Sequence, residues 1–580
     1  MEPVTFKKVW GDALALFYRK RETTWIDLLL LVGLGGMLFA VISLAQNARG
    51  STPENVEIDL APWALALYTF YSLIRGLIAY VLSLAFTLVY GYWAAKDRAA
   101  EKVLVPLLDI LQSIPVLSFF PPVLFALIAL FPHNNIGLEL TCILMIFTGQ
   151  AWNMTFSFYH SLRSIPDDLR EVATVYRFNW WQRFRWLELP SSTIGLVWNS
   201  MMSMAGGWFF LIICESPKIG ETKFRLPGIG SYMEAAQESG SVGLQLLAIA
   251  AMMAMIVLLD QLLWRPVVVW SQKFRVEEGG NQRKMTSWFL DLLRRSQILT
   301  YVGRVFSRFR WQQPPAVIHE AEPFDPLKPS PWASYLSTGV FILLLAGLAY
   351  GAWQLVELIR QVSGYQWETM LKAALLTLGR VLLATALGTL WALPAGLAIG
   401  LSPRLARIFQ PIVQVLASFP APMLYAFIVA GFEMAGASLN WYSVVLMLAG
   451  TQWYILFNII AGSMAIPADL KEAATSYRIT GWQRFRALYF PAVFPYLVTG
   501  WVTAAGGAWN ASILAEYWDY HGQKMSAFGL GAMISKATDE RDFPVLAAST
   551  VVMSTVVVLF NRTVWKRLYR LAEERFSLNK

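Results

Sequence analysis

The sequence predicts an all-α polytopic membrane protein built from two parallel six-helix repeats, with about twelve transmembrane helices. Three observations support this fold class. Hydrophobic residues make up 56% of the 580 residues and charged residues only 15%, with a mean hydropathy of +0.47. Apolar runs long enough to span a bilayer recur along the chain. A twenty-residue segment that begins at Glu171 recurs in closely similar form at Glu472.

The apolar runs predict six spans in each half of the chain. In the first half they cover 25–45, 66–94, 105–131, 137–159, 191–214 and 243–264. In the second half they cover 333–354, 371–400, 408–432, 437–462, 492–515 and 544–565. We interpret 25–45 as a retained helix, because the apolar core of a cleaved signal is shorter. The proline-containing runs 105–131 and 408–432 are candidates for broken or re-entrant helices.

The charged residues predict the orientation in the membrane. The N-terminal segment and both copies of the repeated segment are rich in Lys and Arg, whereas the loop 46–62 is acidic. Positive residues favour the cytoplasmic side, so we expect both termini and both copies inside, and 216–242 and 516–543 outside. The net charge of +9 reflects this arrangement and does not indicate nucleic-acid binding. Cys142 and Cys214 lie in apolar runs and offer no disulfide or metal spacing.

The duplication defines the predicted domains. At a separation of 301 residues Ile165-Pro166 aligns with Ile466-Pro467, and "WQRFR" occurs at 181–185 and at 482–486. Because six spans is an even number, the two units share one orientation. We expect a first unit at 1–265 and a second at 333–580, with the repeated segments at about 163–190 and 464–491.

The linker 266–332 separates the two units. Within 273–310, apolar residues recur near helical spacing among basic ones, which predicts an amphipathic helix on the inner membrane surface. The Pro-rich remainder is expected to be extended. A regulatory module is the alternative interpretation of this linker.

Each copy of the repeated segment predicts a helix–turn–helix on the cytoplasmic face. A proline followed by Asp residues favours the start of a short helix. A basic loop that touches lipid headgroups is one interpretation. It does not explain why Glu171 and Glu472 sit beside small residues at a fixed distance from a proline, so we favour a docking surface for a partner protein.

The repeated segment resembles the EAA loop of the inner-membrane permeases of binding-protein-dependent ABC importers. Glu472-Ala473-Ala474 matches that motif fully, and Glu171-Val172-Ala173 departs at one position. The family's Gly falls on Arg177 and Arg478, which puts the turn in doubt. The external "PGIGSYM" and "FGLGAMI" resemble the nitrate/sulfonate/taurine/bicarbonate branch, whose duplicated permease is most similar. The resemblance covers nearly all of the chain except the linker.

This resemblance implies a type I importer permease fold, in which each EAA loop is a coupling helix seated on one ATPase subunit. The implied function is a permease subunit for a small solute, expected to be an anion. The implied partners are two ATPase subunits, an extracytoplasmic solute-binding protein and the lipid bilayer of a bacterial-type inner membrane. The coupling residues would be Asp168, Arg170, Glu171, Ala173, Tyr176, Arg177 and Arg183 in the first copy, and Lys471, Glu472, Ala473, Ala474, Tyr477, Arg478 and Arg484 in the second.

The chain itself is not expected to hydrolyse ATP. It has no G-x-x-x-x-G-K-[ST] loop, nucleophile–base pair or metal-ligand cluster. ATP and Mg²⁺ are therefore expected on the partner ATPase, and no cofactor is expected on this chain.

Several intramembrane residues are candidates for the substrate pathway. Arg75 and Arg380 lie at matching places in their spans, where an arginine is costly; they form either a cationic lining for an anion or a structural element. The remaining candidates are Asn199, Trp208, Trp509, Asn510 and Ser512, although helix packing alone explains such polar and small stretches. Glu215 and Glu516 lie at the outer ends, where they would anchor the external loop or contact a binding protein.

Two other classes of function remain open from the residues. An ion-coupled secondary transporter needs acidic relays inside the spans, but Asp260 has Asn561 as its counterpart. A membrane enzyme acting on lipids needs clustered catalytic residues at one membrane face, and the sequence offers none.

Overall fold

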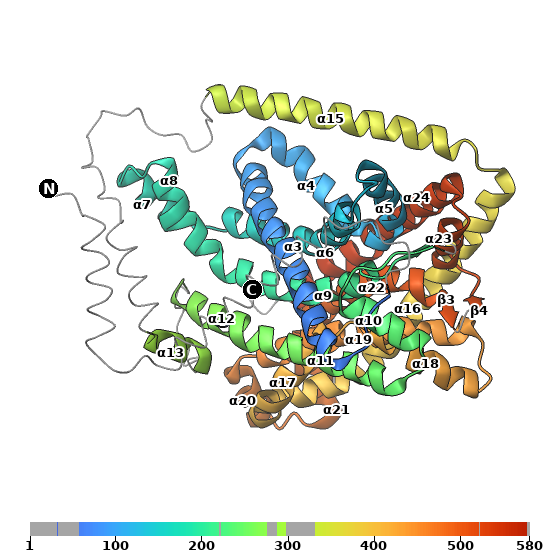
Figure 1. Cartoon of the computed structure of the whole chain (residues 1–580). Helices are drawn as coiled ribbons and strands as arrows, with labels where there is room; N and C mark the ends of the chain where they lie inside the picture. Colours follow the sequence, from blue (N-terminus) through green and yellow to red (C-terminus); the bar gives the residue numbers. More distant parts are fainter. Residues whose placement is uncertain are drawn as a thin grey trace, which may run out of the picture.

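The computed structural model describes Val32 and residues 57–219, 222–274, 287–296, 331–520 and 523–576. The described part is almost entirely helical (Figure 1). The predicted span 25–45 and most of the linker lie outside the described residues. Within the predicted amphipathic segment 273–310, α13 (Trp288–Arg295) is a helix.

The first half contains fourteen helical segments and one hairpin among its described residues. The helices, with short π and 3₁₀ segments written η, are α3 (Pro62–Lys96), α4 (Arg98–Ser113), η1 (Val116–Ser118), α5 (Phe120–Leu130), α6 (Ile136–Arg163), α7 (Asp167–Val175), α8 (Trp180–Arg183), η2 (Phe184–Glu188), α9 (Leu189–Cys214), α10 (Ile229–Glu238), α11 (Val242–Leu259), η3 (Asp260–Trp264), α12 (Arg265–Ser271) and η4 (Gln272–Phe274). The hairpin pairs β1 (Lys218–Ile219) with β2 (Thr222–Lys223) in antiparallel fashion.

The second half follows the same order. Its helices are α15 (Pro331–Ile359), α16 (Gly364–Leu401), α17 (Pro403–Ser418), α18 (Pro422–Met434), α19 (Leu439–Met464), α20 (Ala468–Ser476), α21 (Gly481–Arg484), η5 (Phe485–Tyr489), α22 (Phe490–Ala515), α23 (Leu530–Asp539), α24 (Phe543–Phe560), η6 (Asn561–Trp565) and α25 (Lys566–Phe576). Its hairpin pairs β3 (Tyr517–Tyr520) with β4 (Gln523–Ser526). The all-α, duplicated architecture confirms the predicted fold class.

Both proline-containing runs are broken helices, as predicted. Pro420 forces the preceding Phe419 into an extended conformation (φ −74°, ψ 129°) because its ring disfavours helical geometry there. As a result α17 and α18 meet at an angle of 87°. In the first half the equivalent proline, Pro115, is itself extended (φ −61°, ψ 121°) and lies between α4 and η1.

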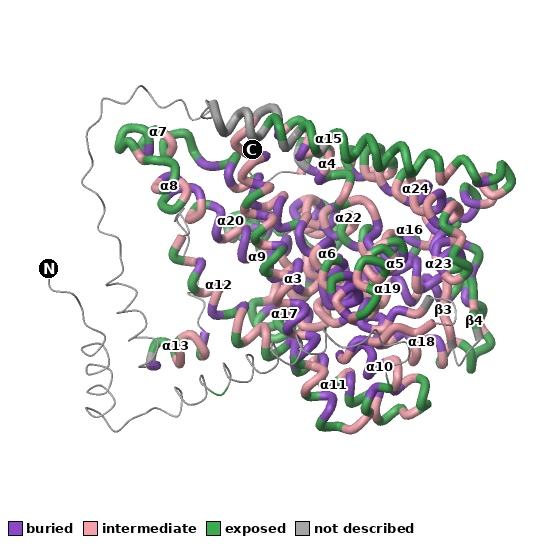
Figure 2. Tube along the Cα trace, turned by 45° about the horizontal axis from the view of Figure 1, so that its top comes forward, coloured by how far each residue is buried: buried purple, intermediate pink, exposed green. Residues whose placement is uncertain are grey.

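By length and composition, seven helices of the described residues can cross a membrane, or eight if the bent pair α17–α18 is one span. The sequence predicted twelve. One of the missing spans lies outside the described residues, and 105–131 is divided between α4, η1 and α5. The run 137–159 forms α6, which carries a polar face. The run 333–354 lies in α15, which runs along one edge of the molecule with most of its described residues exposed (Figures 1 and 2).

The core of each half is a packed set of three long helices. In the first half α6 packs between α3 and α9, and in the second α19 packs between α16 and α22. Glycines permit the close approach: a Cβ on Gly396 of α16 would lie 2.6 Å from the side chain of Ile459 on α19. The halves contact each other where α17 lies against α9 and α11, and where α24 lies against α4.

Candidate functional site

The first copy of the repeated segment forms an exposed helix–turn–helix, α7 and α8. In Figure 2 most of α7 is coloured as exposed, and the segment stands away from the helical body. Ala173 is the one buried residue of α7, with 3% of its surface exposed, whereas Asp168 and Glu171 are exposed. Tyr176 is 72% exposed. A small residue therefore anchors the helix, and its acidic and aromatic side chains remain available to a partner.

The turn after α7 keeps the geometry of a glycine-containing turn, although Arg177 stands where the family has a glycine. The Arg177 N–H donates to the carbonyl of Thr174 and the Phe178 N–H to that of Ala173, both at 2.9 Å. This Schellman pattern needs a left-handed residue at its centre, and Arg177 adopts φ 52°. Arg177 thus takes the conformation that a glycine adopts at no steric cost.

The second copy repeats this geometry in α20 and α21. Ala474 is buried, with 6% of its surface exposed, whereas Glu472 and Ala473 are exposed. Arg478 adopts φ 54°, and Tyr477 is 81% exposed. The two sequence copies therefore present equivalent helices with one buried alanine and one exposed glutamate each.

Arginine side chains tie each exposed helix to its surroundings. Arg170 Nη2 donates to the carbonyl oxygens of Leu162 (3.3 Å) and Arg163 (3.1 Å) at the end of α6. In the second copy Arg484 Nη2 donates to the carbonyl of Lys471 at 3.1 Å. Burial, and the nearby Arg484 cation, lower the pKa of the Lys471 ammonium. The predicted residue Arg170 thus holds the first copy in place. Arg484 holds the second by its bond to the backbone carbonyl of Lys471.

The first copy has an additional buried ionic connection to the spans. The Glu188 carboxylate, 1% exposed, pairs with Lys96 at the end of α3 and lies 3.3 Å from Arg183 Nε. In the second copy the position of Glu188 is occupied by Tyr489, and the Arg484 guanidinium lies 5.4 Å from the Tyr489 ring centre. A cation–π contact thus replaces an ion cluster, so the two elements differ in how they join the membrane helices.

Arg75, a pathway candidate, lies in a closed ionic cluster. Its guanidinium is fully buried and contacts the carboxylates of Glu139 (2.7 Å) and Glu215 (2.8 Å). Its Nη1 also donates to the carbonyl of Pro227 at 2.8 Å. With two carboxylates around one cation, the cluster offers an anion no net positive charge. The geometry favours the structural role that the sequence left open for Arg75.

Arg380 has an equivalent environment with one chemical change. Its Nη1 contacts Glu516 at 2.7 Å, and its Nη2 donates to Oδ1 of Asn440 at 2.9 Å. Asn440 is the counterpart of Glu139. Arg380 is also paired with a carboxylate. The contacts of Arg75 and Arg380 therefore favour a structural role over a cationic lining for an anion.

Glu215 and Glu516 anchor the loops 216–242 and 516–543, which is the loop-anchoring role that was one of the two sequence interpretations. Glu215 accepts hydrogen bonds from Ser72 Oγ (2.6 Å) and the Gly230 N–H (2.8 Å). Glu516 accepts them from Thr377 and from the Gly531 N–H at 2.9 Å. A Cβ on Gly228 would lie 2.3 Å from the Glu215 carboxyl carbon, so the glycine of this motif is required by the close approach.

The remaining pathway candidates differ in how far the structure buries them. Trp208, Trp509 and Ser512 are almost fully buried. Asn510 is partly exposed, and its Nδ2 donates to the carbonyl of Gly506 at 3.1 Å. Asn199 lines an open cleft of about 600 Å³ between α6 and α9. Packing explains Trp509 and Ser512, whereas Asn199 lies at a surface that a solute can reach.

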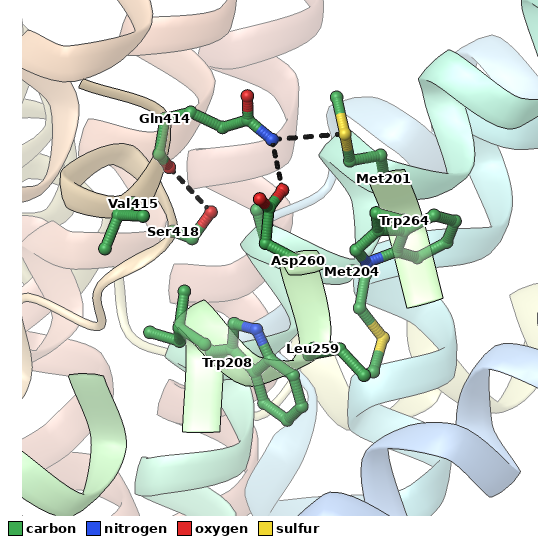
Figure 3. A pocket seen from close by; sticks show the side chains of 11 residues that line it. Met201, Met204, Trp208, Leu259, Asp260, Trp264, Gln414, Val415 and Ser418 are labelled. Atoms are coloured by element: carbon green, nitrogen blue, oxygen red, sulfur yellow. Dashed lines mark hydrogen bonds between the residues drawn. The ribbon is translucent and has the colours of Figure 1, made fainter. Parts of the chain in front are cut away.

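A small cavity lies at the seam between the halves, and sequence reasoning missed it. It has a volume of about 20 Å³, enough for about one water. Figure 3 shows Gln414 of α17 reaching across to the first half, where its amide Nε2 donates to Asp260 Oδ1 at 2.8 Å. Met201 and Trp208 also line it. Asp260 lies in the π segment η3, so its carboxylate holds the two halves in contact.

The opposite seam carries a related contact. Asn561, the counterpart of Asp260, lies in the π segment η6, and its Nδ2 donates to Ser113 Oγ at 3.2 Å. Two equivalent π segments therefore contact the opposite half, one with an acid and one with an amide. In the sequence, Asp260 and Asn561 could be recognised as equivalent positions. Only the tertiary structure shows that they contact Gln414 and Ser113 of the opposite half.

These features define a duplicated polytopic membrane protein with two exposed helix–turn–helix elements. A family model described as "Binding-protein-dependent transport system inner membrane component" matches residues 87–263 and 385–577, together well over half of the chain. The chain belongs to this family, with two copies of the family domain in one polypeptide, and is a multi-pass inner-membrane protein.

Curated relatives share limited identity. The bicarbonate transport system permease protein of Synechocystis sp. is 29% identical over 155 residues, covering 27% of this chain and 52% of the relative. The nitrate import permease protein of the same organism is 24% identical over 169 residues, covering 29% and 58%. The taurine transport system permease protein of Escherichia coli is 24% identical over 212 residues, covering 36% and 72%. The match thus spans little more than half of the first two relatives.

Proposed function

We propose that this chain forms the translocation pathway of an ATP-driven importer for a small solute of the anion class, such as nitrate, bicarbonate, a sulfonate or taurine. Two ATPase subunits dock on it, one on α7 and one on α20. ATP and Mg²⁺ bind to those subunits. An extracytoplasmic binding protein delivers the solute, and both termini of the chain are cytoplasmic.

The observation that carries this proposal is the pair of equivalent exposed helices. Each exposes a glutamate, Glu171 or Glu472, beside an aromatic side chain, which suits a charged, partly apolar groove on a partner. Each is also joined to its spans through arginine contacts. A short helix held in this way can transmit the movement of a partner to the membrane helices as a rigid body.

The solute class is supported by the names of the relatives, which are permeases for bicarbonate, nitrate and taurine. An ion-coupled secondary transporter is the alternative function. One observation favours it, the carboxylate of Asp260 inside a span. Because the equivalent position is Asn561 and Asp260 is bonded to Gln414, we favour the ATP-driven importer.

Co-purification tests the docking proposal. The tagged chain is isolated in mild detergent, and its partners are identified and counted by mass spectrometry. We expect two ATPase subunits per chain, released by the double change Glu171→Lys/Glu472→Lys.

Uptake by vesicles tests the energy source. Vesicles that contain the complex are given nitrate, hydrogencarbonate or taurine, with ATP or with a proton gradient alone. We expect uptake only with ATP. Uptake driven by the gradient alone, from a chain that purifies without an ATPase, would establish the secondary transporter instead.

A further inference from the structure

Most of the residues that line the open cleft in the first half are polar. Seven of the eight residues that line it carry a polar side chain, and none of the eight is acidic. Amide and hydroxyl groups come from Asn153, Ser157, Ser161 and Asn199, and cationic or N–H groups from His160 and Arg163. The lining is therefore rich in hydrogen-bond donors.

The cleft reaches well into the membrane. Asn153 lies ten residues before the last residue of α6, Arg163, and Asn199 lies nineteen residues after Trp180, where the continuous helix α8–η2–α9 begins. At 1.5 Å per residue Asn153 lies about 15 Å from the end of α6 and Asn199 about 28 Å from Trp180, so both lie well inside helices long enough to cross the hydrocarbon core. Polar side chains at that depth face protein or water, not lipid. This face of α6 and α9 therefore borders an aqueous passage.

Neighbouring contacts keep the lining open and ordered. Asn199 Nδ2 donates to Ser157 Oγ at 2.9 Å, which links the two helices across the cleft. Arg163 contacts Glu101 at 3.2 Å, so its charge is partly balanced from behind. A Cβ on Gly195 of α9 would lie 3.0 Å from Ser161 Oγ and 3.2 Å from Ser157 Oγ. The absence of a side chain at Gly195 leaves the serine hydroxyls accessible.

The second half fills the equivalent space. The counterpart of Gly195 is Tyr496, and the counterpart of Ser161 is Gly462. A Cβ on Gly462 would lie 2.8 Å from the Tyr496 ring, so the ring occupies the volume that is open in the first half. His160 is replaced by Ala461. Among the described residues, the second half therefore has a filled space where the first half has a cleft.

We propose that the first half alone builds the inner vestibule of the pathway, and that this cleft receives a small oxyanion on its way to the cytoplasm. The lining supplies N–H and O–H donors, those of the Arg163 guanidinium included, from which oxyanions accept hydrogen bonds, and none of its residues is a carboxylate that would repel them. The proposal rests on the proposed import function and adds to it the location of the exit in one half of the chain.

Thiol labelling tests the vestibule without a transport assay. Cysteine replaces Ser157, or its second-half counterpart Asn458, in the complete complex with Cys142→Ser and Cys214→Ser. Inside-out vesicles receive a membrane-impermeant thiosulfonate reagent that is either a sulfonate anion or a quaternary ammonium cation. Each rate is divided by that reagent's rate with a free thiol.

We expect Ser157→Cys to react with the anionic reagent roughly tenfold faster than Asn458→Cys, and faster than with the cationic reagent, because the cleft is open and favours anions. Equal rates at the two positions would overturn the one-sided vestibule. A preference for the cationic reagent at Ser157→Cys would overturn the oxyanion class.

Transport provides the second test. Gly195→Tyr fills the cleft as Tyr496 does in the second half, and should reduce ATP-driven uptake of nitrate, hydrogencarbonate or taurine at least roughly tenfold. The matched change Tyr496→Gly should alter it less than twofold. Because Gly195→Tyr also risks misfolding, Ser157→Cys is modified in the folded complex, and uptake should be lost and then restored by a reductant.

Full modification of Ser157→Cys without loss of uptake would overturn the proposal. If the unmodified complex shows no ATP-driven uptake of any solute, the proposed import function fails. The labelling rates then still decide whether an anion-selective, one-sided cleft exists.

Discussion

Lys218 of the first half and Asp519 of the second occupy equivalent positions in the two repeats, and they form an ion pair with each other. Their hairpins, β1–β2 and β3–β4, meet at this pair. Two equivalent residues can touch only where the axis that relates the repeats passes between them. The pair therefore places the pseudo-twofold axis between the two hairpins. In a dimer of identical chains the same position would meet its own charge, so fusion of the repeats permits an attraction here.

The first prediction concerns this axial pair. Lys218→Asp should place two carboxylates together, and Asp519→Lys two ammonium groups, and each should lower the stability of the purified chain by about 0.5–1 kcal/mol. The double exchange should restore most of the loss. Thermal unfolding of the four proteins gives the coupling through a double-mutant cycle. Additive losses without recovery would show that the pair contributes nothing to the contact between the halves.

The second prediction concerns the exposed glutamates. Glu171→Lys with Glu472→Lys should abolish ATP-driven transport without lowering the unfolding temperature, because both side chains are exposed. Each single variant should retain one docked ATPase subunit. The control is Glu433→Lys, an exposed carboxylate at the end of α18, which should leave uptake unchanged. Normal uptake by the double variant would disprove the coupling role.

The third prediction concerns the left-handed turn. Arg478→Gly should stabilise the chain by up to about 1 kcal/mol, because a non-glycine residue with positive φ costs about 1–2 kcal/mol and glycine's greater entropy in the unfolded chain offsets part of that gain. Arg478→Val should destabilise it, since a β-branched residue fits this conformation poorly. Thermal unfolding orders the three proteins. The reverse order would mean that the Arg478 side chain contributes more than its backbone strain costs.

The fourth prediction compares the two buried arginine clusters. Glu139→Asn places an amide beside Arg75, as Asn440 lies beside Arg380 in the second cluster. This change should lower the free energy of unfolding by only about 1–2 kcal/mol. Glu215→Ala removes the carboxylate that holds both Arg75 and the Gly230 N–H, and should cost about 3–5 kcal/mol. Chemical unfolding in detergent measures both. Equal costs would contradict the view that Glu215 is the central anchor of the cluster.

The fifth prediction concerns pH at the external loop of the first half. Burial raises the pKa of Glu238, but its contacts with Lys223 and Arg225 outweigh burial and hold it below the ordinary value. A carboxyl with a depressed folded pKa contributes stability that is complete above the unfolded pKa of about 4.3 and is lost as the pH falls through the folded value. The protection of the β1–β2 amides from hydrogen exchange, measured against the intrinsic exchange rate at each pH, should therefore fall below about pH 4, and Glu238→Gln should remove this pH dependence.

Much of the fold followed from local patterns. Apolar runs located the long helices α3, α16 and α22, and prolines located the breaks, because each depends on residues close together in the chain. The repeat located the two exposed helices. The sequence pattern did not reveal that Arg177 and Arg478 would keep the turn of a glycine, since only the backbone angles of the folded chain show it.

The candidate pathway was harder to predict. Arg75 and Trp208 were reasonable candidates by composition, yet one is enclosed by two carboxylates and the other is buried. Whether a polar side chain in a span faces water, lipid or a partner depends on the helix opposite it. Asn199 and Gly500 occupy equivalent positions in the two repeats, but the space beside them is set by Gly195 in one case and by Tyr496 in the other.

The sequence by itself determined that this is a duplicated, membrane-spanning helical protein with two copies of one helix–turn–helix segment, because hydropathy and internal repetition are properties of the chain read in order. Only the tertiary structure decided where the two repeats differ. Glu139 against Asn440, Glu188 against Tyr489 and Gly195 against Tyr496 are single substitutions whose consequences arise from residues far away in the chain. Their contacts form when the helices pack, so no local pattern encodes them.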